Sequence, residues 1–300
     1  MKKLLYILIC IFLYSCSNSS DNKIEEQKND WEQGGRVISG RLEIPRLRNI
    51  SGVDQFIDHT TTLNGQTMET YCMEYNYIKF HSRWVAFYIT TSNSFSGSGV
   101  VRSDYGGGPG FVVDPEIPAD YQTNKSDYNP NYDRGHLCAS ADRFYSQEAN
   151  NQTFYYSNMS PQLNAFNAGI WMHLEGKVRS WGYNRSLCDT LFIAKGGTIN
   201  SNDLIMAYTT TGKHKVAVPK YYFMALLAKK GNTYQAIGFL LEHKTTYPNS
   251  GFGFQQYAMT IKELESKTKI DFFPNLPDNI ESNVESVVDQ GFWKNLNADN

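Results

Sequence analysis

Several features that would mark a specialised class of chain are scarce or missing in this sequence of 300 residues. Proline (10) and glycine (23) are few and follow no period, which excludes collagen and repeat arrays. Charged residues make up 19% and aromatic residues 14%, a balance that excludes a disordered chain. Basic residues (28) do not outnumber acidic ones (30), so the net charge of −2 excludes a uniformly basic nucleic-acid coat but leaves room for a locally basic groove.

Common catalytic signatures are also missing. No C-x-x-C or H-E-x-x-H pair is present, which argues against a zinc enzyme. A serine hydrolase would need a G-x-S-x-G elbow, and residues 96–99, Ser-Gly-Ser-Gly, have the wrong spacing. The glycine cluster at 106–110 lacks the Lys-Ser/Thr ending of a P-loop and therefore predicts a turn.

A long apolar run occurs at the start of the chain. Residues 4–14 follow two lysines and precede Ser15 and Cys16, a pattern typical of a secretory signal that is too short to span a bilayer. Residues 13–16 resemble a bacterial lipobox, in which cleavage precedes a cysteine that is then acylated. We therefore expect an exported protein, anchored through a lipid on Cys16 to the periplasmic or cell-surface side of a bacterial membrane. The alternative is an ordinary cleaved signal with an incidental cysteine.

The rest of the chain predicts one domain. Residues 1–15 form the expected signal peptide, and the polar stretch 16–36 reads as a flexible tether, which leaves 37–300 as a single folded domain. Three cysteines remain in this domain, in a compartment that permits disulfides. We favour a bridge between Cys138 and Cys188; the alternative is that these two and Cys72 are all buried thiols.

Hydrophobic patterning predicts an α+β domain. Strands are expected over 83–91, 153–158, 190–194, 216–228 and 234–241. Helices are expected over 162–181 and 258–267. Strands and helices do not alternate regularly, which favours a mixed or antiparallel sheet with helices packed on it over a doubly wound fold.

The helix expected over 162–181 carries polar residues at a spacing of four. An apolar set fastens it to the core: Phe166, Ile170, Leu174 and Val178. A polar stripe runs beside that set: Asn167, Trp171, Glu175 and Arg179. Such a stripe is often a solvated face, but Asn has no propensity reason to occupy a helix, so Asn167 points to a functional role.

A second group of reactive side chains lies at residues 132–136, Tyr-Asp-Arg-Gly-His. A lone histidine is usually structural. His136 follows Asp133 and Arg134, beside a glycine that lets a ligand approach the backbone, so it is a candidate general base near neutral pH.

These residues resemble a known family. Residues 133–136, Asp-Arg-Gly-His, are similar to the DRGH signature of the DNA/RNA non-specific endonucleases, which have a ββα-metal core. Further similarity covers 158–162, Asn167, Gly169, Trp171 and Glu175, and extends over roughly residues 75–280. The resemblance implies a ββα-metal motif within the α+β domain.

The resemblance also implies a role for each matched residue. His136 would deprotonate the attacking water. Asn167 would be the direct protein ligand of one Mg²⁺, with Mn²⁺ as a substitute, and Glu175 would orient water around the ion. Three arginines would bind the phosphate: Arg102, Arg134 and Arg179. Asn158 would support the site.

The implied function is an exported, metal-dependent endonuclease that cleaves DNA and RNA without strong sequence preference and leaves 5′-phosphates. Residues 176–230 hold nine basic and two acidic residues, a local excess that suits either a substrate groove or ordinary solvated lysines on strand edges. The alternative function is a surface lipoprotein that keeps the fold and binds nucleic acid without catalysis.

Overall fold

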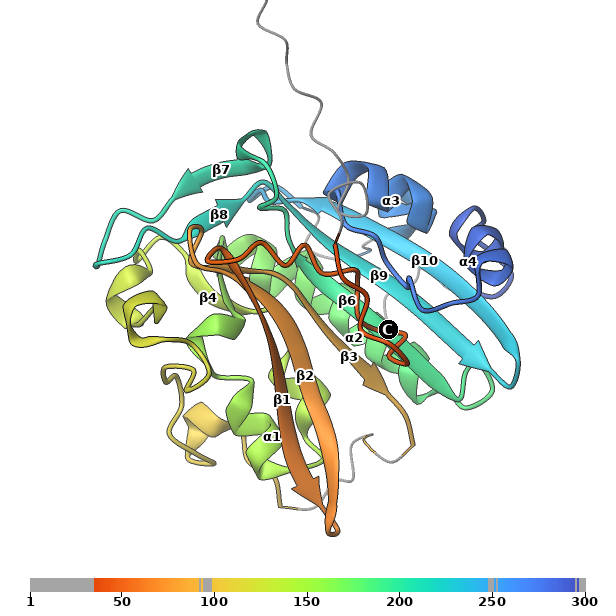
Figure 1. Cartoon of the computed structure of the whole chain (residues 1–300), viewed down its shortest axis with the longest axis horizontal. Coiled ribbons are helices and arrows are strands. Elements are labelled where there is room, and N and C mark those ends of the chain that lie inside the picture. Colours follow the sequence, from red (N-terminus) through yellow and green to blue (C-terminus); the bar gives the residue numbers. More distant parts are fainter. Residues whose placement is uncertain are drawn as a thin grey trace, which may run out of the picture.

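The computed structural model describes residues 35–91, 93, 99–247, 251, 253–294 and 296 (Figure 1). The expected signal peptide, Cys16 and nearly all of the expected tether lie outside these residues. Within the described part, no helix has the length and apolar character needed to cross a membrane.

A seven-stranded antiparallel sheet forms the centre of the domain, in the order β1-β2-β3-β6-β9-β10-β11 (Figure 1). Its strands are β1 (Asp54–Leu63), β2 (Gln66–Asn76), β3 (His81–Ile89), β6 (Thr190–Gly197), β9 (Tyr221–Lys230), β10 (Thr233–Glu242) and β11 (Ala258–Met259). The architecture is mixed α+β, which confirms the predicted fold class.

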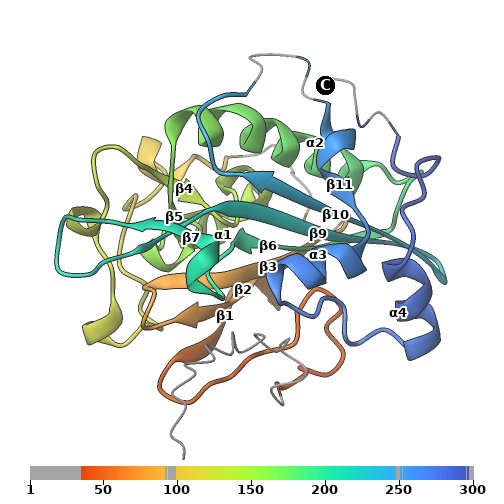
Figure 2. The same ribbon diagram turned by 90° about the horizontal axis from the view of Figure 1, so that it is seen from above.

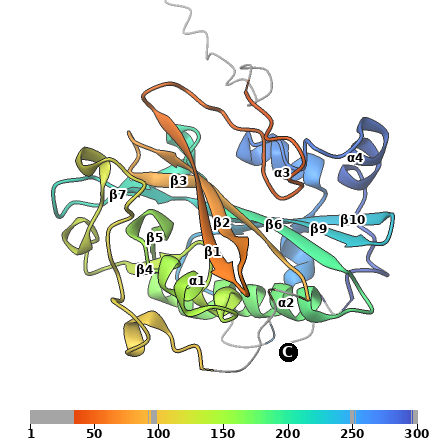
Figure 3. The same ribbon diagram turned by 60° about the horizontal axis from the view of Figure 1, so that its bottom comes forward.

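The central strands of the sheet are covered on both faces, because their alternate residues pack on the α2 side and on the α3 side. On β6, Leu191 and Ile193 join the core on the α2 side, whereas Phe192 and Ala194 pack with the core on the α3 side. Figures 2 and 3 show α2 on one face of the sheet and α3 on the other. The helices that cover the sheet are α2 (Met172–Tyr183), α3 (Ile261–Thr268) and α4 (Asp278–Glu285).

A smaller layer lies on the α2 side and contains the predicted motif. Strands β4 (Asp133–His136) and β5 (Met159–Gln162) pair antiparallel, and a π-helical segment, Phe166–Trp171, then leads directly into α2. This is a strand–strand–helix unit in which the DRGH residues form all of β4. The short helix α1 (Gln147–Gln152) lies between β4 and β5 in the chain, and β7 (Ile205–Tyr208) pairs with β8 (Ala217–Pro219).

Four predicted strands match observed ones, with differences at their ends. The strand expected over 216–228 is divided after Pro219, where Lys220 donates its backbone N–H to Leu204 and starts a new strand. The strand expected over 153–158 is wrong. There the backbone N–H groups of Phe154 and Asn158 bond to carbonyls three residues earlier, so the segment is a series of turns.

Both predicted helices begin later than expected. Gln162 belongs to β5, and the helical stretch includes the π-helical residues Phe166–Trp171 ahead of α2. The stretch expected over 258–267 begins as strand β11. Helix α3 starts after Thr260, whose hydroxyl accepts from the N–H of Glu263 while the Glu263 carboxylate accepts from the N–H of Thr260. This capping box ends the strand and fixes the start of the helix.

The expected Cys138–Cys188 bridge is not formed. All three described cysteines, the third being Cys72, are free and buried. The Cys188 thiol donates to the carbonyl of Trp181, and burial raises the pKa of Cys138 to about 12 and that of Cys188 to about 11. The thiols therefore act as small apolar side chains in the core.

Candidate active site

Strand β4 carries His136 next to a glycine that has no room for a side chain. A Cβ atom on Gly135 would lie 2.0 Å from the side-chain oxygen of Gln162, a residue that is itself fully buried. Glycine at 135 thus leaves space for the Gln162 side chain directly beside His136.

The imidazole of His136 lies in an aromatic pocket. Its ring centroid is 4.7 Å from that of Phe154, edge-on, and 5.8 Å from that of Phe111. Atom Nε2 is buried and finds no hydrogen-bond partner in the described part of the chain. Burial, helped by the charges of Arg102, Lys195 and Arg134, lowers the pKa of His136 to about 3. The imidazole is therefore neutral at pH 7 and able to accept a proton.

Two of the predicted arginines pack on the rings that contact His136. The Arg102 guanidinium lies 4.9 Å from the Phe154 centroid, and that of Arg134 lies 3.8 Å from the Phe111 centroid. Arg102 also pairs with Asp104 at 2.7 Å. Both positive charges therefore lie next to the histidine, as a phosphate-binding role requires.

Asn158 has a supporting position. Its side chain is fully buried and accepts from the N–H of Cys138 at 2.8 Å. The Nδ2 atom donates to the carbonyls of Cys138 and Thr153 at 2.9 Å and 2.7 Å. These bonds occupy both ends of the amide. Asn158 therefore holds the backbone at Cys138, two residues after His136, in a fixed position.

Asn167 lies in the π-helical segment, where its amide is oriented by the DRGH motif itself. Nδ2 of Asn167 donates to Oδ2 of Asp133 at 2.9 Å. A carboxylate only accepts, so this bond fixes which end of the amide faces Asp133. Oδ1 then faces away, and no hydrogen bond to it is found among the described residues, which leaves it available as a ligand.

Glu175 and Arg179 extend from the first two turns of α2, each held by one partner. Lys195 on β6 donates from Nζ to Oε1 of Glu175 at 2.6 Å. Arg179 forms an ion pair with Asp142, a nearly buried residue that follows β4. Burial raises the pKa of Glu175, and the Lys195 charge opposes that rise.

The predicted polar stripe is not a single helix face. The φ/ψ angles of Gly169 are −104° and −120°, so the backbone departs from a helix between Asn167 and Trp171. Trp171 is buried in the core, whereas Asn167 and Glu175 are half-buried. A straight-helix wheel could not show this, since π-helical geometry changes the angle between successive residues.

The residues present fit a hydrated divalent cation. Asn167 Oδ1 is available, and Glu175 accepts a bond on Oε1 while Oε2 has no partner among the described residues. In the described part of the chain, no three His, Cys, Asp or Glu side chains cluster in a way that could hold a metal ion. A cation at Asn167 would therefore keep most of its water, as Mg²⁺ commonly does.

The basic residues of 176–230 do not share one exposed surface. Lys177 and Lys195 are buried, and Lys230 pairs with Asp189 at 3.3 Å. Lys195 in particular lies beneath Glu175 and is closed to a phosphate backbone. The local excess of charge in the sequence thus combines buried and exposed groups.

Sequence reasoning missed the partners of the predicted residues. In the sequence, Lys195 is one of the nine basic residues of 176–230, which are interpreted together as a groove or as solvated lysines. The sequence assigns no role to Asp142, Phe111 or Phe154. For Lys195 the sequence does contain a signal. Within the strand, Lys195 follows Leu191 and Ile193 at a spacing of two, so it shares their buried, α2-facing side of β6. A charge at such a position predicts a buried partner.

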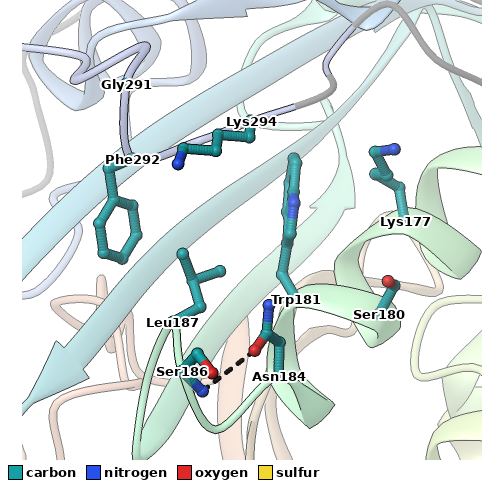
Figure 4. Close-up of a pocket in the computed structure, with 9 residues that line it drawn as sticks. All are labelled: Lys177, Ser180, Trp181, Asn184, Ser186, Leu187, Gly291, Phe292 and Lys294. Atoms are coloured by element: carbon teal, nitrogen blue, oxygen red, sulfur yellow. Dashed lines mark hydrogen bonds between the residues drawn. The ribbon is translucent and has the colours of Figure 1, made fainter.

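A separate cavity of about 380 Å³ lies farther along α2 (Figure 4). Figure 4 shows α2 residues facing the segment around Phe292. Its lining residues are Lys177, Ser180, Trp181, Asn184, Ser186, Leu187, Gly291, Phe292 and Lys294. None of the predicted site residues lines this cavity, so it is distinct from the site around His136.

Comparison with known proteins finds similarity to several nucleases. The chain is 28% identical over 238 residues to Nuclease C1 of Cunninghamella echinulata var. echinulata, covering 76% of this chain and 90% of that protein. It is 30% identical over 227 residues to a nuclease of Nostoc sp. (strain PCC 7120), covering 73% and 76%. Human mitochondrial endonuclease G is 30% identical over 176 residues, 55% of this chain and 57% of that protein.

The fold is shared with a solved structure. A chain from the crystal structure of the EndoG/EndoGI complex superposes with a TM-score of 0.61 at 21% identity, covering 75% of this chain and 89% of that chain. The sequence model described as DNA/RNA non-specific endonuclease matches residues 52–279, which include every predicted site residue except Cys16. The chain therefore belongs to the DNA/RNA non-specific endonuclease family.

Proposed function

We propose that this chain is an exported endonuclease that hydrolyses phosphodiester bonds of DNA and RNA without strong sequence preference, leaving 5′-phosphates. One observation carries the proposal: His136 presents a neutral imidazole whose Nε2 is unpaired in the described structure, against two phenylalanine rings that each carry an arginine. The charge of Lys195 lowers the pKa of His136 and opposes the rise in the pKa of Glu175, so both groups respond to the same buried ammonium.

The chemistry follows from these side chains. His136 removes the proton of the attacking water through Nε2, which is unpaired in the described structure, and the imidazole is uncharged at neutral pH. Arg102 and Arg134 hold the phosphate and offset the charge that builds on its oxygens. A bound Mg²⁺, held by Asn167 and replaceable by Mn²⁺, would supply charge stabilisation at the phosphate and the leaving oxygen.

The other residues hold this arrangement in place. Asp133 orients the Asn167 amide, and Asn158 holds the backbone that follows His136. Arg179 reaches the phosphate when it exchanges Asp142 for substrate. Glu175 orients water at the site through its oxygen that is not bonded to Lys195.

Purified protein should convert supercoiled plasmid to a smear in the presence of Mg²⁺, and EDTA should reduce the rate to background because the phosphate then lacks its cation. Plasmid and single-stranded RNA are measured in parallel on gels, and ligation of the products without kinase treatment reports 5′-phosphates. Binding to both nucleic acids with no cleavage under any divalent cation would instead favour the non-catalytic lipoprotein.

We also propose that the protein is lipid-anchored through Cys16, because residues 13–16 resemble a lipobox behind a short apolar run. In cells, the wild-type protein should fractionate with membranes and take up a labelled fatty acid, whereas Cys16→Ala should lose the label. Equal labelling of the two proteins would contradict the anchor without affecting the nuclease proposal.

A further inference from the structure

A lysine occupies the middle of the central sheet, where strand alternation calls for an apolar residue. Lys195 lies on β6 between Val85 of β3 and Met224 of β9, and it is 1% exposed. Both neighbours belong to the apolar core beneath α2. The aliphatic stem of Lys195 is therefore enclosed by apolar side chains. Its ammonium needs a negatively charged partner inside the protein, because the surrounding core offers none and solvent is excluded.

The ammonium group is directed at the candidate active site. Nζ lies 2.6 Å from Oε1 of Glu175 and 5.7 Å from the ring centroids of both Phe87 and Trp171. The Lys195 side chain is 2% exposed and that of Glu175 is 12% exposed. The lysine thus supports the carboxylate from inside the protein, and the carboxylate forms the part of the pair that solvent can reach.

A buried ion pair of this kind contributes little to the stability of the folded state. Removing two charges from water costs about as much as their attraction returns, so apolar residues of similar size are often as good for stability. Burial alone would raise the pKa of Glu175 and favour its uncharged form. Lys195 opposes that rise and occupies one carboxylate oxygen, while Oε2 has no partner among the described residues.

We propose that Lys195 is a positioning residue: its ammonium fixes the Glu175 carboxylate by one oxygen, so that the other oxygen faces the reaction. This inference rests on the proposed nuclease function. It assigns to Lys195 a task inside the site, distinct from contact with the nucleic-acid backbone, because the side chain is closed to substrate.

The first test compares Lys195→Met with wild type in steady-state cleavage of plasmid. We expect kcat to fall roughly 10- to 100-fold, the usual effect of losing a residue that supports a metal-site ligand or its water, while KM stays within about twofold. Lys195→Arg keeps the charge and should recover part of the rate. Lys267→Met removes an exposed lysine from α3, on the other face of the sheet, and should leave both parameters unchanged.

The second readout needs no turnover. Titration calorimetry of Mn²⁺ into the apo protein should show roughly tenfold weaker binding for Lys195→Met, because the released carboxylate no longer holds the water around the ion in a fixed position. Simple removal of a positive charge near the cation would tighten binding instead. Tighter or unchanged Mn²⁺ binding would therefore contradict the proposal.

A double variant separates positioning from general damage. If Lys195 acts through Glu175, then Glu175→Gln/Lys195→Met should be no slower than Glu175→Gln alone, because the two losses are not additive. Removing both charges together also avoids a lone buried charge, so this protein should fold even if Lys195→Met does not. Additive losses would overturn the inference.

Failure of this inference is distinguishable from failure of the proposed function. A wild-type protein that cleaves plasmid, together with a Lys195→Met variant of normal kcat, would contradict the role of Lys195 alone. A raised KM at unchanged kcat would point to substrate contact and also contradict it. A wild-type protein with no cleavage would contradict the nuclease proposal itself.

Discussion

Replacing His136 with alanine should abolish hydrolysis while nucleic-acid binding survives. Removal of a general base typically costs 10²–10⁴ in rate, and among the described residues no other histidine ring packs against Phe111 or Phe154. The arginines that we propose as phosphate ligands are retained, so affinity should change little. The measurement pairs plasmid cleavage with fluorescence anisotropy of a labelled oligonucleotide.

The matched control is His173→Ala, which removes an exposed histidine from the first turn of α2. Its cleavage rate should remain within about twofold of wild type, since surface substitutions seldom perturb a site they do not touch. Full activity in His136→Ala would refute the assignment of the base. Equal losses in both variants would indicate damage to α2 rather than loss of a base.

Asn167→Ala should have the second large effect. It removes the available amide oxygen from the site, and we expect the rate at saturating Mg²⁺ to fall by about 10³-fold, or roughly 4 kcal/mol of transition-state stabilisation. Asn167→Asp should not restore wild-type activity, because a carboxylate cannot donate to Asp133 and would face a second negative charge across 2.9 Å. The readout is cleavage rate against Mg²⁺ concentration for each variant.

Asn164→Ala provides the control for this experiment. Asn164 also donates from Nδ2 to Oδ2 of Asp133 at 2.9 Å, but it is exposed. Its loss should change the rate by no more than about threefold, since Asp133 keeps its bond to Asn167. If the Asn164 and Asn167 variants lose activity equally, the bond to Asp133 matters and the ligand role of Asn167 is wrong.

Sequence patterns predicted the parts of the fold that depend on local periodicity. The sequence predicted strands β3, β6 and β10 and helix α2. Their residues carry the hydrophobic patterns of a strand or, for α2, apolar residues at a spacing of four. The hairpin of β1 and β2 was missed, although Asn64-Gly65 at its turn is a strong hairpin signal. Both turn residues have positive φ, 52° and 78°, the left-handed conformation that a two-residue turn requires and that this pair favours.

The sequence allowed the residues of the candidate site to be named, but not the contacts that hold them in place. The motif at 133–136 is visible in the sequence, whereas the space that Gly135 leaves for Gln162 and the bond by which Asp133 orients Asn167 are found only in the structure. The departure from helical geometry at Gly169 and the pairing of Glu175 with Lys195 are not visible in the sequence. The pairing joins α2 to β6 across 20 residues of chain, and a single sequence does not encode such a contact locally.

The most direct test of the account is to locate the cation in a crystal of the wild-type protein soaked with Mn²⁺. Anomalous scattering should place one ion at bonding distance from Oδ1 of Asn167, about 2.1 Å by analogy with Mg²⁺ sites, in a cavity shared with Nε2 of His136. An ion found at other residues, or His136 and Asn167 opening into separate spaces, would contradict the central claim.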